Sequence, residues 1–242
     1  MFDTKLSKLL LQIDKDTLVI SDTHFNHDGV LKFEPCRLKA MHNDGMSLYT
    51  KGEESLLNIA HTEWIIKNWN EKVKPDDIII HLGDVAWKGH QEIIPRLNGI
   101  KILILGNHDK KGPNTYHQFD HVVRGYYNIK DGKVSIVRST DPLMSCIQLQ
   151  FGLDRILLSH YPATTKEHRY RKEGDKIIWQ TPINDRIDAL IEICKDESIN
   201  LNIHGHTHSL SYNKTSGKRF KNVSMEAINF RPCTLKECLD DN

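Results

Sequence analysis

Five short apolar runs, each followed by polar residues, constrain the fold of this chain more than any other feature. The runs are Thr17–Ser21, Asp77–Leu82, Lys101–Leu105, Arg155–Ser159 and Ile199–His204. Their apolar residues follow one another without polar alternation, which predicts strands that are covered on both faces. Strands of this kind lie in sheets sandwiched by helices, so we expect an α/β architecture.

Weaker patterns add further strands and two helices. The additional strands are predicted over His121–Lys130, Lys133–Arg138, Ser145–Gln150 and Lys221–Asn229. The pair Asp131-Gly132 favours a hairpin turn between the first two of these stretches. Apolar periodicity predicts helices over Leu56–Val73 and Asn184–Glu197, and Asn184 is the expected N-cap of the second helix. The alternation of strands and helices implies layers built on one or two sheets.

The length of 242 residues fits one large α/β domain. No internal repeat or shift in composition marks a boundary, so we expect a single domain over residues 1–242. Two stretches, Asn26–Ser55 and Pro162–Pro182, are long, polar and interrupted by Gly and Pro. Long loops in a compact domain are usually functional. We therefore expect these two stretches to be inserts that form the wall of a substrate site.

The charge of the chain is balanced, with 33 Lys and Arg residues against 32 Asp and Glu residues. Proteins that track a nucleic-acid backbone usually carry a basic excess. Nucleic acid is therefore a partner that the composition disfavours, although Lys166–Lys176 is locally basic.

The five cysteines are scattered, odd in number and free of CxxC pairs. This predicts reduced thiols in a cytoplasmic protein. The N-terminal segment lacks the pattern of a signal peptide. No apolar stretch approaches the roughly 20 residues that span a bilayer, so we expect no membrane association.

Each of the five apolar runs is followed by side chains that can bind a metal. In chain order these residues are Asp22 and His24, Asp84, Asn107, His160, and His206 and His208. Ligand sites of α/β sheets lie at the carboxyl ends of the strands, where these side chains would meet. Imidazole, carboxylate and amide groups suit Mn, and Fe, Zn, Co or Ni as alternatives. Seven ligands exceed the needs of one ion and favour two ions that share a carboxylate.

The same residues form five ordered blocks: D-x-H, G-D, G-N-H-D/E, a lone His, and G-H-x-H. In this chain the blocks are Asp22-Thr23-His24, Gly83-Asp84, Gly106-Asn107-His108-Asp109, His160 and Gly205-His206-Thr207-His208. With all five blocks in order over most of its length, the chain resembles the calcineurin-like metallophosphoesterases. The resemblance implies a two-sheet αββα sandwich of the metallophosphoesterase type, with the site at the carboxyl ends of the strands.

The resemblance also implies how two metal ions are held. Asp22, His24 and His208 would bind the first ion, and Asp84 would bridge both ions. The ligands of the second ion would be Asn107, His160 and His206. A pair of divalent ions about 3.5–4 Å apart lowers the pKa of a shared water, and the bridging hydroxide attacks phosphorus.

Other residues of these blocks are expected to act on the substrate. His108 would face the phosphate and protonate the leaving oxygen, because imidazole titrates near neutral pH. Asp109 would orient His108 and raise its pKa. Asn107 is also an expected substrate contact. His27 is either a substrate contact or a histidine that stabilises its loop, and Arg169 either clamps the substrate or lies in a solvated loop.

The substrate itself is less defined than the reaction. The motifs do not separate phosphomonoesters from phosphodiesters, and the charge balance favours a nucleotide or a similar small phosphate ester. A nuclease that acts on DNA or RNA ends is the alternative. A non-catalytic scaffold is disfavoured because every ligand is present. For Trp87 and Tyr161 we favour packing over stacking on a nucleobase.

Overall fold

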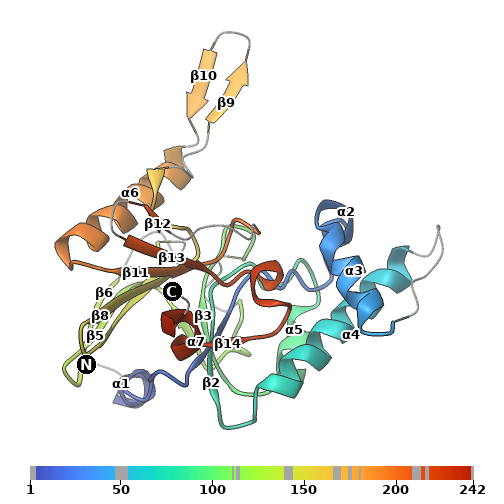
Figure 1. Ribbon diagram of the computed structural model, residues 1–242, viewed down its shortest axis with the longest axis horizontal. Helices are drawn as coiled ribbons and strands as arrows, with labels where there is room; N and C mark the ends of the chain where they lie inside the picture. The colour runs from blue at the N-terminus through green and yellow to red at the C-terminus, as the bar shows by residue number, and fades with distance from the viewer. Residues whose placement is uncertain are drawn as a thin grey trace.

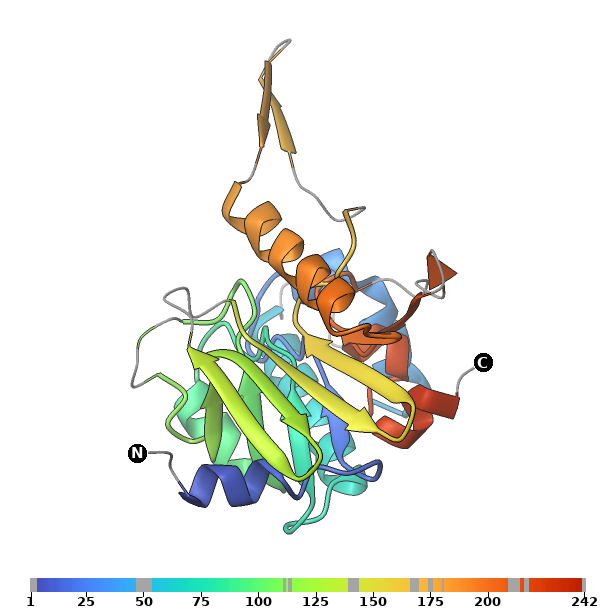
Figure 2. The same ribbon diagram turned by 90° about the vertical axis from the view of Figure 1, so that its left-hand side faces the viewer.

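The computed structural model describes residues 4–46, 54–110, 112, 115–138, 144–165, 170–173, 176–179, 181–208, 214–215 and 218–240. Two mixed β-sheets form the centre of the molecule, and helices cover their outer faces (Figures 1 and 2). This arrangement confirms the αββα sandwich that the sequence predicts.

The first sheet has five strands and carries the N-terminal motifs. Its strands, in spatial order, are β14 (Cys233–Thr234), β1 (Leu18–Ile20), β2 (Ile78–His81), β3 (Ile100–Ile104) and β4 (His121–Val123). The strands β1 to β4 run parallel, whereas β14 is antiparallel to β1. The ends of β1, β2 and β3 therefore meet at one edge of the sheet.

The second sheet has seven strands and carries the C-terminal motifs. Its strands, in spatial order, are β12 (Lys214–Thr215), β13 (Lys218–Asn222), β11 (Leu201–His204), β8 (Asp154–Ser159), β7 (Cys146–Phe151), β5 (Gly125–Lys130) and β6 (Lys133–Arg138). The strands β8, β11 and β13 run parallel. Antiparallel pairs join β7 to β8, β5 to β6 and β12 to β13.

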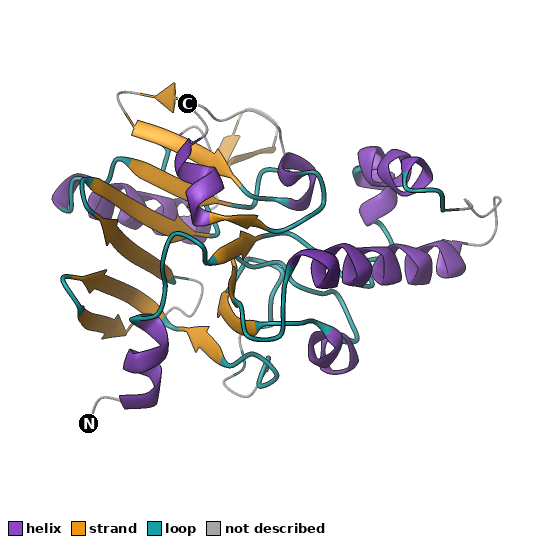
Figure 3. Cartoon of the chain, turned by 60° about the horizontal axis from the view of Figure 1, so that its bottom comes forward, coloured by secondary structure: helices purple, strands orange, loops and turns teal. Residues whose placement is uncertain are grey.

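Helices lie outside the two sheets and at their ends. They are α1 (Thr4–Leu10), α2 (Val30–Phe33), α3 (Pro35–Asn43), α4 (Glu54–Lys72), α5 (His90–Ile93), α6 (Thr181–Asp196) and α7 (Leu235–Asp240). Short 3-10 helices cover Ile94–Arg96 and Met225–Ile228. The helices α2 and α3 lie beside the N-terminal part of α4 (Figure 3).

Alternate residues of each strand enter different layers of the core. Ile80 of β2 and Leu158 of β8 lie between the two sheets, where apolar side chains of both sheets pack together. Ile79 of β2 packs instead against Trp69 and its neighbours from α4. Leu157 of β8 packs with residues of α6 on the far side of the second sheet. Burial on both faces explains why the strand sequences are apolar without alternation.

Helices at the two ends of the described chain share the core between the sheets. Leu10 of α1 and Leu239 of α7 both belong to this cluster. Their common packing supports the proposal that residues 1–242 form one domain. No helix in the described part of the chain is long and apolar enough to cross a membrane.

Three boundaries differ from the sequence predictions. The stretch His121–Lys130 forms β4 and β5, which belong to different sheets, because the chain turns at Gly125 with a φ of +127°. The stretch predicted as a strand up to Asn229 leaves the sheet at Asn222 and continues as a 3-10 helix. Asn184 is not an N-cap, because α6 already begins at Thr181. Proline is favourable in the first helical turn, and Pro182 occupies it.

The two long polar stretches contain regular structure. Asn26–Ser55 includes α2, α3 and the start of α4. Within Pro162–Pro182, the strands β9 (Tyr170–Glu173) and β10 (Lys176–Trp179) form an antiparallel hairpin. This hairpin projects from the body of the molecule just before α6 (Figures 1 and 2). Arg169 lies outside the described residues.

A pair of leucines on the β7–β8 hairpin tests the packing between the sheets. Leu158 is fully buried, whereas Leu153 is 94% exposed at the turn. We expect Leu158→Ala to lower the free energy of unfolding by about 2–5 kcal/mol, because it leaves a cavity in the core. Leu153→Ala, the matched control, should change it by less than about 0.5 kcal/mol. Equal effects of the two variants in urea denaturation would contradict the packing described above.

Candidate metal centre

The predicted metal ligands follow strands of both sheets. They are Asp22 and His24 after β1, Asp84 after β2, Asn107 after β3, His160 after β8, and His206 and His208 after β11. Because these strands are parallel within each sheet, the ligands gather where the carboxyl ends of the two sheets meet. A pocket of about 330 Å³ opens there and is lined by residues from both groups of strands, together with Ile183 of α6.

The backbone turns sharply at most of these positions. Five of the seven residues have a positive φ: Asp22 (59°), His24 (49°), Asp84 (57°), His206 (70°) and His208 (50°). A left-handed conformation is uncommon outside glycine and costs about 1–3 kcal/mol when sparsely populated regions are used. Several residues with this costly backbone conformation thus lie together at the ligand positions. Such clusters of strained backbone are typical of functional sites.

Two of the motif glycines allow the ligand loops to come close together. A Cβ atom at Gly106 would overlap the side chain of Asp84. At Gly205 it would overlap the side chains of Ser21 and Asp22. Larger residues at either position would push the carboxylates out of place, so the glycines bring the loops into contact.

The first group of donor atoms comprises Asp22, His24 and His208, whose ligand atoms lie within 4.8 Å of one another. The Nε2 atoms of His24 and His208 are 3.1 Å apart. Nε2 of His208 lies 3.3 Å from Oδ1 of Asp22, and Nε2 of His24 lies 3.9 Å from Oδ2 of Asp84. Carboxylate oxygens and imidazole nitrogens, which can each donate a lone pair to a metal, thus lie close together.

The second group comprises Asn107, His160 and His206. Nδ1 of His160 donates to the carbonyl oxygen of Leu82 at 2.8 Å, which leaves the lone pair of Nε2 for the site. That Nε2 atom is 2.9 Å from Oδ1 of Asn107 and 3.6 Å from Oδ2 of Asp84. The ring of His206 packs against His160 with centroids 5.1 Å apart. Oδ2 of Asp84 thus lies within 4 Å of a histidine from each group.

The two central carboxylates each accept hydrogen bonds through one oxygen. Oδ2 of Asp22 accepts hydrogen bonds from the backbone N–H of His206 and the hydroxyl of Ser224, at 2.9 and 3.0 Å. Oδ1 of Asp22 is buried and, among the described residues, accepts no hydrogen bond. Oδ1 of Asp84 accepts from the backbone N–H of His108 at 2.8 Å. A buried carboxylate oxygen without a donor fits a cation.

The protonation states of the carboxylates show the same need for positive charge. Burial raises the pKa of Asp84 well above its usual value, and the charges of Asp22 and Asp109 add to this rise. Burial also opposes the ionisation of Asp22, but contact with His208 and the charge of His160 hold its pKa well below the usual value. Divalent cations would neutralise this buried cluster of acids.

The imidazoles differ in their readiness to bind a metal. Burial lowers the pKa values of His24 and His160, so both rings are neutral and offer a lone pair. Burial also opposes protonation of His208, but its contacts with Asp22 and Glu226 raise its pKa to about 10. A metal ion that binds Nε2 of His208 must therefore displace a proton. The donor set fits two divalent ions, while the role of each ligand stays a prediction.

Asp109 has other partners than the sequence predicts. Its carboxylate accepts hydrogen bonds from the backbone N–H groups of Asp84, Val85 and Gly106 and from the hydroxyl of Tyr116, at 2.8 to 3.0 Å. None of these four bonds reaches the ring of His108. Asp109 thus ties the G-D loop to the G-N-H-D loop. Its charge does favour protonation of His108, but burial and the charge of His160 outweigh it, and the pKa of His108 is lowered.

The order of the motifs, the fold and the site agree with a family comparison. The family model for calcineurin-like phosphoesterases matches residues 16–210. The chain belongs to this family.

Individual relatives match only part of the chain or share a modest identity with it. An uncharacterized protein of Methanocaldococcus jannaschii is 34% identical over 99 residues, which cover 39% of this chain and 47% of that protein. The Gene 66 protein of Mycobacterium phage D29 is 30% identical over 158 residues, which cover 62% of this chain and 66% of that protein. The chain thus spans about half and just under two thirds of the length of these relatives. The structure of a protein of unknown function from Aquifex aeolicus is 26% identical, with a TM-score of 0.57, over 92% of this chain and 96% of that chain.

Two residues outside the motifs contact the first ligand group. Nδ1 of His208 contacts Oε1 of Glu226 at 3.1 Å, on the side of the ring opposite to the site. The fully buried Arg37 donates to the same oxygen and to the carbonyl oxygens of Asp22 and Thr23, at 2.6 to 3.0 Å. Burial opposes the ionisation of Glu226, but Arg37 holds its pKa below the usual value. A carboxylate behind a ligand histidine fixes the ring and raises its basicity.

Sequence reasoning did not single out Arg37 and Glu226. They are separated by 189 positions in the chain, and neither lies in one of the five blocks. Arg37 belongs to α3, in a stretch for which the sequence gives no element. Glu226 lies in the 3-10 helix that replaces the end of a predicted strand. No local signal pairs these two residues.

The remaining aromatic residues that the sequence singles out lie close to the ligand histidines. The rings of His27 and His24 are 5.5 Å apart, and His27 also packs on Trp87 with centroids 4.5 Å apart. Tyr161 is buried against His206, so packing accounts for it. Trp87 is 49% exposed, so the favoured packing role describes it only in part.

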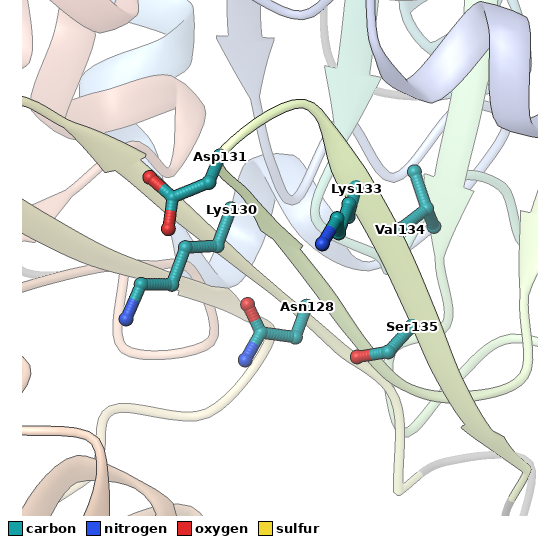
Figure 4. A pocket seen from close by; sticks show the side chains of 6 residues that line it. All are labelled: Asn128, Lys130, Asp131, Lys133, Val134 and Ser135. Carbon is teal, nitrogen blue, oxygen red and sulfur yellow. The ribbon is translucent and has the colours of Figure 1, made fainter.

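A second hollow, of about 500 Å³, lies on the hairpin of β5 and β6 (Figure 4). Its lining residues are Asn128, Lys130, Asp131, Lys133, Val134 and Ser135. They include none of the histidines of the metal centre, and all of them come from one hairpin. This hollow therefore lacks the donor set found at the strand ends.

The contact between Glu226 and His208 generates a prediction about metal affinity. Glu226→Gln keeps the shape of the side chain but removes the charge behind the ligand, so we expect manganese affinity to fall about 10–100-fold. Isothermal titration of the metal-free protein with Mn²⁺ measures this change. Glu63→Gln is the matched control, because Glu63 also pairs with an arginine, Arg96, but at the surface. Unchanged affinity in a folded Glu226→Gln variant would contradict the supporting role of Glu226.

Proposed function

We propose that this protein is a hydrolase of phosphate esters that uses two divalent ions. The observation that carries the proposal is the clustering of two overlapping sets of possible metal ligands, Asp22, His24 and His208 and Asp22, Asp84 and His160, at a pocket lined by His24, Asp84 and His208. The chain also belongs to the calcineurin-like phosphoesterase family. The ions we propose are Mn²⁺, with Fe, Zn, Co or Ni as alternatives. When bound, they would supply Lewis-acid activation of the attacking water and of the phosphoryl oxygens.

Each of the two groups of ligands would hold one metal ion. Asp22, His24 and His208 would hold one ion, and Asn107, His160 and His206 the other. Asp84 would contact both, since one of its oxygens faces the imidazoles of both groups. The amide nitrogen of Asn107 would remain free to donate to a phosphate oxygen. The seven side chains thus fix the position of the phosphate.

His108 would donate a proton to the oxygen of the leaving group. Its side chain lines the pocket, and its backbone is fixed by the hydrogen bond to Asp84. Its lowered pKa makes the imidazole a weak base in the free protein. A phosphate ester carries negative charge, which favours the protonated ring, so substrate binding would load His108 with its proton. We propose Asp109 as a positioning residue for the loop that carries Asn107 and His108.

The substrate we propose is a nucleotide or a similar small phosphate ester. The pocket of about 330 Å³ has the size of a small-molecule site. The balanced charge of the chain supports a small ester over a polynucleotide. A nuclease is the alternative, and its binding would weaken steeply as salt rises. Since all five cysteines are free thiols, we also propose a reducing, cytoplasmic setting.

Removal of the bridging charge tests the proposed reaction. We expect Asp84→Asn to reduce the hydrolysis of p-nitrophenyl phosphate and bis-p-nitrophenyl phosphate with Mn²⁺ to the background rate. Asp131→Asn is the matched control, because Asp131 also has a left-handed backbone but lies exposed at a hairpin turn. Near-undiminished turnover by a folded Asp84→Asn variant would overturn the bridging role. If the wild type hydrolyses neither ester, the scaffold alternative gains support.

The proton donated by His108 should matter most for poor leaving groups. We expect His108→Ala to slow the hydrolysis of alkyl phosphate esters about 10²–10⁴-fold. With p-nitrophenolate, which leaves without a proton, the loss should be much smaller. His42→Ala, at an exposed position of α3, is the control. An equal loss with both kinds of ester would rule out proton donation to the leaving oxygen.

A further inference from the structure

Three aromatic rings lie next to one another, and two of them contact His24 and His108, which line the pocket. The ring of His27 lies between Trp87 and Phe33, with centroid distances of 4.5 and 6.3 Å. The planes of these neighbours are inclined by 35° and 29° to that of His27. We call this set of residues, Trp87, His27 and Phe33, the aromatic wall.

The backbone holds the aromatic wall in place beyond the metal ligands. The pairing of β1 and β2 continues past the site as a bridge between Phe25 and Ala86. The N–H of Trp87 donates to the carbonyl oxygen of Phe25 at 2.9 Å. The ring of Phe33 lies over Gly29, where an added Cβ would come within 2.7 Å of it. The wall is thus a part of the folded scaffold and not a loose loop.

The position of the wall relates it to the leaving group. The ring of Trp87 lies 5.6 Å from that of His108, which lines the pocket. The ring of His27 lies 5.5 Å from that of the proposed ligand His24. Since His108 would protonate the departing oxygen, the group attached to this oxygen would lie next to Trp87.

The exposure of the wall is unusual for aromatic side chains. Phe33 is 73% exposed and Trp87 is 49% exposed, whereas Trp64 and Trp69 are buried in the core. Lys88, next to Trp87, is paired with Asp28 at 3.0 Å, so these two charges offset each other. An uncharged aromatic face beside a phosphate site suits an uncharged planar ring.

We propose that the aromatic wall binds a planar ring on the leaving-group side of the substrate. The substrate class is then an ester of an aromatic or nucleoside alcohol, as opposed to a sugar or alkyl phosphate. This inference rests on the proposed function and specifies which alcohol the substrate ester would contain. Trp87 is the central specificity-determining residue, because it lies closest to His108 within the wall.

Matched esters test this selection. Benzyl phosphate and cyclohexylmethyl phosphate both release a primary alcohol, but only the first has a planar ring. The corresponding methyl diesters extend the test to phosphodiesters. Stacking of one ring corresponds to about a five- to hundredfold preference in kcat/KM for the benzyl ester. We expect Trp87→Ala to abolish the preference and Trp87→Phe to keep most of it. Leu153→Ala, an exposed apolar side chain at the opposite end of β8, should leave it unchanged.

A binding measurement separates the wall from the reaction. The phosphonates 2-phenylethylphosphonate and 2-cyclohexylethylphosphonate replace the ester oxygen by a methylene group and cannot be hydrolysed at that position. Titration of the Mn²⁺-loaded protein should show tighter binding of the phenyl compound, and Trp87→Ala should remove the difference. Equal binding of the two compounds, or no binding of either, overturns the aromatic wall as a substrate face. If the phenyl compound binds selectively but no ester is hydrolysed, the proposed reaction fails while the wall stands.

Discussion

The structure depends on the burial of Asp22 and Asp84 side by side where the two sheets meet. Buried carboxylates cost free energy unless they are paired, and each of these has an oxygen that faces the imidazole of a predicted ligand histidine. A third buried carboxylate, that of Asp109, adds negative charge close by. Divalent cations are the simplest way to balance such a cluster of negative charge. The same acids would thus bind the ions that the proposed reaction needs.

The surrounding fold serves to keep these acids in place. Left-handed backbone at Asp22 and Asp84 turns the chain back immediately after the strands. Asp109 then binds the N–H groups of the neighbouring loop, and Arg37 binds carbonyl oxygens of the D-x-H turn. The rigid core between the sheets fixes the strands from which these turns start. Local strain at the site is thus offset by packing elsewhere.

The sequence predicts the strands that carry the site, because strands buried on both faces leave apolar runs that are easy to recognise. It also predicts which side chains gather, because the ends of parallel strands share an edge. It does not predict that the stretch around Gly125 changes sheets, since β4 and β5 have the same local pattern. Nor does it predict the pairing of Arg37 with Glu226, which only the tertiary fold brings about. Nor does it predict the partners of Asp109, because nearly every residue has a backbone N–H group and the sequence does not indicate which of them a carboxylate will bind.

The central claim is that two metal ions share Asp84 at the junction of the sheets. Anomalous diffraction from crystals grown with Mn²⁺, collected on both sides of the manganese absorption edge, tests it most directly. We expect two peaks, one among Asp22, His24 and His208 and the other among Asn107, His160 and His206, with Asp84 between them. A single peak, or peaks away from these side chains, would contradict the two-metal centre.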